Sequence, residues 1–221
     1  MIAIGEARGC RTVGLLTAMD RPLGHACGNA LEVVEAIAGL RGEGPQDLME
    51  VTLALGVEML LVAEVERDPG QARRRLEDTI SGGSALERLA AMVEAQGGDP
   101  AVIADPGRLP RAPVVVDYRA QRDGFIQSVE PRTVGYGVIN LGGGRRVAED
   151  TVDPAVGFVI TAKPGHPVRS GDRLATIHAG TDVAAEAARQ VLDRAIAIGD
   201  PIPVPPLVSH RVTCDGVTPM S

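Results

Sequence analysis

The residues best suited to chemistry lie in "RPLGHACGNALEVVEAI", residues 21–37, where a bend with two glycines runs directly into a helix-like stretch with two carboxylates. Such a stretch could cradle a phosphate, hold a cation or simply cap a helix. Asn29 is followed three residues later by Glu32, which is the spacing of a helix N-cap with a capping box. The spacing therefore favours a capped helix over a phosphate cradle.

A second stretch, "INLGGGRRVAED", contains three successive glycines, Gly142–Gly144, followed by two arginines. Backbone N–H groups of such a loop bind phosphate when the loop joins a strand to a helix. No convincing helix follows here, because the next residues lead to a strand. We therefore expect a turn that requires positive φ, with two solvated arginines.

The histidines do not form a metal site by spacing. No two of them have the separation of metal ligands on one element, so we expect structural roles for each. The four residues are His25, His166, His178 and His210. The sequence also lacks a G-x-S-x-G motif or a Cys/His pattern of the kind that a hydrolase uses.

Composition excludes several classes of partner. A formal net charge of −7 argues against nucleic acid and anionic membranes, because both require a basic surface. Aromatic residues make up 2% of the chain, too few for base stacking. No apolar run is long enough to span a bilayer. The three cysteines include no CxxC pair and indicate neither a disulfide framework nor zinc, so we expect a cytoplasmic protein.

The first half of the chain is predicted to be mainly helical. "MIAIGEARGC" is typical of the last turns of a helix, which suggests that part of the protein precedes it. "RTVGLLT", residues 11–17, is typical of a buried strand. Residues 29–97 are nearly all helical, and apolar residues at three- and four-residue steps after Pro45 predict a mostly buried helix.

A proline-rich stretch at 99–113 precedes a region with strand patterns and one long helix from 182. "GFIQSVEP" and "VGFVITAKPGHPVRSGDRLATIHAG" resemble the sandwich of biotinyl and lipoyl carrier domains. Lys163, the only lysine, precedes a proline and lacks the flanking residues of a modified carrier lysine. We therefore expect the architecture without the carrier function.

The predicted fold class is α/β followed by α+β. The expected domains are an α/β part at 1–105, an α+β barrel-sandwich-like part at 106–200 and a proline-rich tail at 201–221.

These pieces occur together in one family. "LLTAMDRPLGHACGNALEVVEAIAGLRGEGPQDLMEVTLALGVEMLLVAE" resembles the central region of thymidine phosphorylase and the bacterial pyrimidine-nucleoside phosphorylases. The resemblance continues in order through "GGSALERLAAMVEAQGGDP", "DGFIQSVEPRTVGYGVINLGGGRR", "DPAVGFVITAKPGHPVRSGDRLATIHA" and "PPLVSHRVT". It covers nearly the whole chain but only the C-terminal portion of the family pattern.

The resemblance implies phosphorolysis of thymidine to thymine and 2-deoxyribose 1-phosphate by a homodimer that binds phosphate and a pyrimidine nucleoside. The family's phosphate-binding and base-reading motifs lie in its N-terminal half. No catalytic or substrate-binding residue of the family therefore falls in this chain. We expect the isolated chain to be inactive without that half. The alternative is a stand-alone structural or interaction module without enzymatic activity.

One family site does carry over by resemblance. Pyrimidine-nucleoside phosphorylases hold a monovalent cation, K⁺ or Na⁺, near the hinge between their domains. The matching residues here are Leu23 and Ala26, through their carbonyl oxygens, and Glu35, through its carboxylate. Oxygen ligands suit a hard cation. The remaining ligands would come from a loop outside this chain, so the expected shell is incomplete. The chemistry itself requires no cofactor.

Overall fold

The computed structural model describes residues 1–220, which form two compact units drawn from separate stretches of the chain. The first unit contains residues 1–18, 39–88 and 205–220, and the second contains residues 19–38 and 89–204. Contiguous domains at 1–105, 106–200 and 201–221 stay a prediction from the sequence. The compact units interleave these ranges because strands far apart in the sequence pair with one another.

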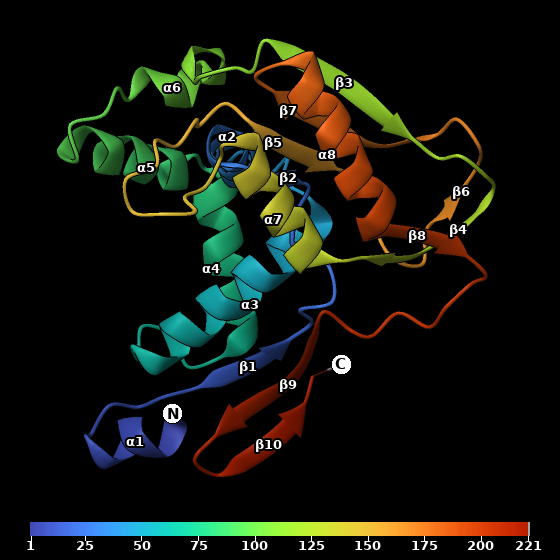
Figure 1. Ribbon diagram of the computed structural model, residues 1–221. Helices are drawn as coiled ribbons and strands as arrows, with labels where there is room; N and C mark the ends of the chain where they lie inside the picture. Colours follow the sequence, from blue (N-terminus) through green and yellow to red (C-terminus); the bar gives the residue numbers. More distant parts are fainter. Residues whose placement is uncertain (221) are drawn as a thin grey trace. The chain divides into compact units, whose positions relative to one another are not determined.

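The first unit combines helices with a small antiparallel sheet (Figure 1). Its elements are α1 (Ile2–Ala7), β1 (Gly14–Thr17), α3 (Gln46–Val62), α4 (Pro69–Ser81), β9 (Val208–Thr213) and β10 (Gly216–Pro219). The strand order is β1-β9-β10, and Gly14 lies opposite Val212. The stretch expected as an irregular tail thus contains a hairpin. Four of its five prolines lie at 201–206, and the β-branched residues that follow favour strands.

Two burial predictions in this unit were wrong. In α3, Val51 and Leu53 are buried, but Leu55 and Met59 are 47% and 71% exposed. Leu16 of β1 is 51% exposed, although the run 11–17 was expected to be buried. The helix α3 packs chiefly on α4, and this packing leaves Leu55 and Met59 exposed.

The second unit is a set of antiparallel sheets covered by helices (Figure 1). Its strands are β2 (Ala26–Cys27), β3 (Val114–Arg119), β4 (Gly124–Val129), β5 (Gly157–Ile160), β6 (Pro167–Val168), β7 (Arg173–Ala179) and β8 (Ile196–Gly199). One sheet has the order β2-β5-β7-β3 and the other β6-β4-β8. Its helices are α2 (Asn29–Leu40), α5 (Ser84–Ala95), α6 (Ala101–Ala104), a 3-10 turn η1 (Pro106–Arg108), α7 (Pro131–Leu141) and α8 (Asp182–Ala195), of which α2 and α5 continue into the first unit.

The core of the second unit lies between these sheets and the pair α7 and α8. Phe158, Ile177 and Leu192 are fully buried in it. The mixed α/β character agrees with the predicted fold class, with every sheet pairing antiparallel among the described strands. None of the helices in residues 1–220 has the length and apolarity that a membrane span requires.

Helix α7 was not predicted from the sequence. Its two internal glycines, Gly135 and Gly137, lower its helix propensity. Packing compensates, because a Cβ at Gly137 would lie 2.8 Å from Val191 and 3.0 Å from Phe158. The small residue lets the helix approach both α8 and β5. Glu130 caps the helix by accepting hydrogen bonds from the backbone N–H groups of Arg132 and Thr133.

Candidate functional site

The bend at residues 22–26 connects directly to β2 and then to α2, all within the second unit. Gly24 has φ of +67°. This left-handed conformation favours glycine. A Cβ there would also lie 2.2 Å from Oε2 of Glu35. The bend is therefore shaped around the Glu35 carboxylate, and no other residue type fits at position 24 without a shift.

Glu35 binds the bend from helix α2. Its Oε1 accepts hydrogen bonds from the backbone N–H groups of His25 at 2.8 Å and Ala26 at 3.0 Å. Strand β2 is the edge strand of its sheet, and the carbonyl of His25 accepts from the N–H of Ile160 on the inner side. Glu35 thus satisfies the outer, unpaired side of this short strand with charge-assisted hydrogen bonds.

Lys163 binds the same bend from the connection between β5 and β6. Its ammonium group donates to the carbonyl of Pro22 at 3.0 Å and to the carbonyl of Gly24. The two partners lie 141 and 139 residues away in sequence. Lys163 is the only lysine of the chain, and nothing in the local sequence pointed to this contact.

The structure brings together two of the three predicted cation ligands. Glu35 contacts Ala26 directly, through the backbone N–H. Ala26 lies at the start of β2, opposite Val159 of β5. Leu23 lies in the same bend, between the two residues whose carbonyls bind Lys163.

These residues fit an added cation only in part. Oε1 of Glu35 already accepts two hydrogen bonds, and Oε2 lies against the Cα of Gly24. An ammonium group already binds two carbonyls of the bend. Among residues 1–220 there is no group of three or more His, Cys, Asp or Glu side chains arranged to hold a metal ion. The cation site at Leu23, Ala26 and Glu35 stays a prediction.

The start of α2 is organised differently from the predicted cap. The backbone N–H of Gly28 donates to Oε1 of Glu32 at 2.9 Å, and the carbonyl of Gly28 accepts from the N–H of Glu32. The side chain of Asn29 instead donates to the carbonyl of Gly143 at 2.9 Å. The predicted helix is confirmed, but the predicted N-cap role of Asn29 is wrong: Gly28 precedes the helix in the cap position, and the Asn29 side chain ties α2 to the glycine-rich turn.

The glycine-rich turn ends helix α7 and is not a phosphate cradle. Gly142 has φ of +98° and caps the C-terminus of α7. This end of a helix presents carbonyl groups and partial negative charge, which disfavours an anion. Arg146 binds Asn140 through its side chain and Asp150 through its backbone N–H. The expectation of a turn with positive φ is confirmed.

A cavity of about 400 Å³ lies between the bend, the start of α2 and α7. Cys27 is its one residue with nucleophilic potential. Burial, followed by the nearby Glu32 carboxylate, raises the pKa of the Cys27 thiol to about 11. The thiol is therefore protonated at neutral pH and is a poor nucleophile.

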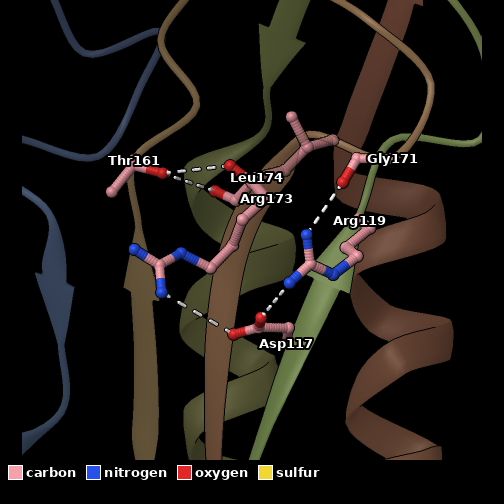
Figure 2. A network of polar contacts seen from close by, with 6 residues as sticks. All are labelled: Asp117, Arg119, Thr161, Gly171, Arg173 and Leu174. Atoms are coloured by element: carbon pink, nitrogen blue, oxygen red, sulfur yellow. Dashed lines mark hydrogen bonds and ion pairs between the residues drawn. The ribbon is translucent and has the colours of Figure 1, made fainter.

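A second polar cluster joins β3 and β7 (Figure 2). Asp117 lies between two arginines, 2.5 Å from Arg119 and 3.9 Å from Arg173. Arg119 also donates to the carbonyl of Gly171 at 2.9 Å, and the Thr161 hydroxyl donates to the carbonyl of Leu174 at 3.3 Å. Arg119 and Arg173 are opposite each other in the strand register, so Asp117 offsets their repulsion. This arrangement explains the cluster as a structural one.

The histidines lie on different elements of the chain. The half-buried ring of His178 lies in β7, and burial lowers its pKa. His210 lies in β9, with Nδ1 3.1 Å from the hydroxyl of Ser209. His25 contributes its backbone N–H to Glu35.

Comparison with known proteins gives a consistent result over most of the chain. Residues 125–199 match the pyrimidine nucleoside phosphorylase C-terminal domain. The chain is 36% identical over 213 residues to a pyrimidine-nucleoside phosphorylase from Geobacillus stearothermophilus, covering 96% of this chain and 49% of that protein. It is 38% identical over 213 residues to the pyrimidine-nucleoside phosphorylase of Staphylococcus aureus strain USA300, with the same two coverages. The chain spans about half the length of the curated relatives it matches.

Proposed function

Because this chain belongs to the pyrimidine-nucleoside phosphorylase family, matching the C-terminal half of its members, we propose that it is the C-terminal portion of an enzyme that cleaves pyrimidine nucleosides with inorganic phosphate. The products are the free base and a pentose 1-phosphate. With thymidine they are thymine and 2-deoxyribose 1-phosphate. The supporting observation is the identity of 36% and 38% to two relatives over 96% of the chain.

In this proposal the chain supports catalysis and does not carry it. The ammonium of Lys163, the only lysine, binds backbone carbonyls of the 22–26 bend. The Cys27 thiol is protonated at neutral pH because burial raises its pKa to about 11. Phosphate and the nucleoside would bind to groups supplied by an N-terminal half. Assembly as a homodimer in the cytoplasm is part of the same proposal.

The test is complementation between two separately produced polypeptides. One is this chain, and the other is the N-terminal half of the Geobacillus relative. Phosphate-dependent conversion of thymidine to thymine is followed by absorbance, with uridine as a second substrate to define specificity. We expect no turnover by either polypeptide alone and turnover by the mixture.

Three results would count against the proposal. Turnover by this chain alone would show that it contains its own catalytic groups. A mixture that neither turns over nucleoside nor co-elutes in size-exclusion chromatography would favour a stand-alone module. A mixture that co-elutes without turnover would also contradict a catalytic pairing and favour an interaction role.

A further inference from the structure

Two oppositely charged side chains clamp the bend at residues 22–26 from different elements. Lys163 binds the carbonyls of Pro22 and Gly24, and Glu35 binds the N–H groups of His25 and Ala26. We propose that the Lys163 ammonium is the resident cation of this bend. It supplies from within the chain the positive charge that a bound K⁺ or Na⁺ would otherwise supply.

The chemistry of the contacts supports this role. A lysine ammonium is a compact charge with three donors and no acceptor, so it satisfies carbonyl oxygens much as a monovalent metal ion does. The bend is bound by one carboxylate, that of Glu35, and by one ammonium, that of Lys163. The formal charges of these two groups cancel. A second cation in the same five residues would meet the Lys163 charge at close range and would be repelled.

The position of Lys163 is fixed independently of the bend. The residues around it are tied to neighbouring strands: Gly165 N–H donates to the Ile126 carbonyl at 2.8 Å, and Ala162 N–H donates to the Leu174 carbonyl at 3.1 Å. The N–H of His166 closes the turn on the carbonyl of Lys163. The backbone that carries the ammonium is therefore already ordered, so holding the bend costs only the rotamer entropy of the Lys163 side chain.

The role of Lys163 is independent of the proposed catalytic function, so its test does not use activity. Thermal unfolding of the wild-type chain and of Lys163→Met is compared in KCl, NaCl and choline chloride at equal ionic strength. Methionine keeps similar bulk without the charge. The exposed Arg145→Met provides a matched control, since it removes a positive charge elsewhere in the same unit.

We expect the unfolding temperature of the wild type to be the same in all three salts, and likewise that of Arg145→Met. Lys163→Met should unfold at a lower temperature in choline chloride and recover part of the loss in KCl or NaCl, because metal ions can then bind the vacated carbonyls. A higher unfolding temperature of the wild type in KCl or NaCl than in choline chloride would contradict the proposed role of Lys163. A Lys163→Met chain that shows no difference between salts also overturns it, whether it is destabilised or not.

A second measurement tests the proposal on the wild-type chain and does not require Lys163→Met to fold. Because Lys163 is the only lysine, labelling lysine with ¹⁵N at Nζ gives one side-chain ammonium signal in the wild-type chain. We expect a slowly exchanging signal at neutral pH that KCl does not shift relative to choline chloride. An ammonium signal lost to rapid exchange with water, or one that KCl displaces, contradicts the assignment.

Discussion

The Cα of Gly24 lies directly against the carboxylate of Glu35, so that a Cβ at position 24 would be 2.2 Å from Oε2. The same carboxylate accepts two backbone hydrogen bonds from the residues that follow Gly24. The shape of the bend and the position of the charge therefore depend on each other. Bulk added to Gly24 displaces the carboxylate, and loss of the carboxylate leaves the edge of β2 without its partner.

Gly24→Ala should destabilise the second unit by about 3 kcal/mol, since it combines left-handed backbone strain with a steric clash. Gly171→Ala is the matched control in the same unit, with φ of +90° and no atom within 4 Å of the added Cβ. It should cost about 1 kcal/mol, from strain alone. Thermal or urea unfolding measures both changes. Equal losses in the two variants would show that Glu35 moves aside freely.

In the first unit, Glu58→Gln should destabilise the contact between α3 and β9 by about 1–2 kcal/mol. Glu58 binds Arg211 through two hydrogen bonds of 2.6 and 2.9 Å, and its side chain is 12% exposed. Glu77→Gln breaks an exposed pair with Arg73 on α4 and should change stability by less than about 0.5 kcal/mol. Urea unfolding of the two variants gives the comparison. A smaller loss in Glu58→Gln than in Glu77→Gln would contradict the structural importance of the pair.

Asp117→Asn should destabilise the sheet formed by β3 and β7 by about 1 kcal/mol, because Arg119 and Arg173 then face each other without a bridging charge. Added salt should reduce the loss by screening the repulsion. Glu149→Gln removes the same charge from an exposed position and should have no such effect. Unfolding midpoints at low and high ionic strength test this. A loss that does not change with salt would point to hydrogen bonding in place of repulsion.

The raised pKa of the Cys27 thiol predicts that the folded chain loses stability at alkaline pH. Burial raises its pKa from the ordinary value of 9.0 to about 11. Between these values the unfolded chain has released the Cys27 proton, which the folded chain retains. The contribution of this thiol to the free energy of unfolding is therefore fully present below pH 9 and is lost as the pH rises toward 11. Cys27→Ala should flatten the decline in unfolding temperature across this range, whereas the exposed Cys214→Ala should not.

Thiol labelling at neutral pH gives an independent check of the same property. Ellman's reagent should modify the exposed Cys10 and Cys214 of the folded chain quickly and the partly buried, protonated Cys27 much more slowly. Three fast-reacting thiols in the folded chain would mean that Cys27 is neither buried nor protonated as described.

The helices with strong periodicity and the strands rich in β-branched residues were predictable from local sequence. Helices α2, α3 and α8 and strands β4 and β7 formed where the patterns predicted them, because helix and strand periodicity is a property of short-range spacing. Helix α7 was not predictable in this way. Its glycines are unfavourable locally and are accommodated only by close packing on α8 and β5.

The sequence by itself determined the family, the bend at residues 22–26 and the acidic helix that follows. Only the tertiary structure decided how that bend is held. Lys163 reaches it from 141 residues away, and no local rule relates a turn lysine to the carbonyl of Pro22. The same holds for the pairing of β1 with β9. Such contacts depend on three-dimensional packing, in which residues far apart along the chain satisfy one another's charges and hydrogen bonds.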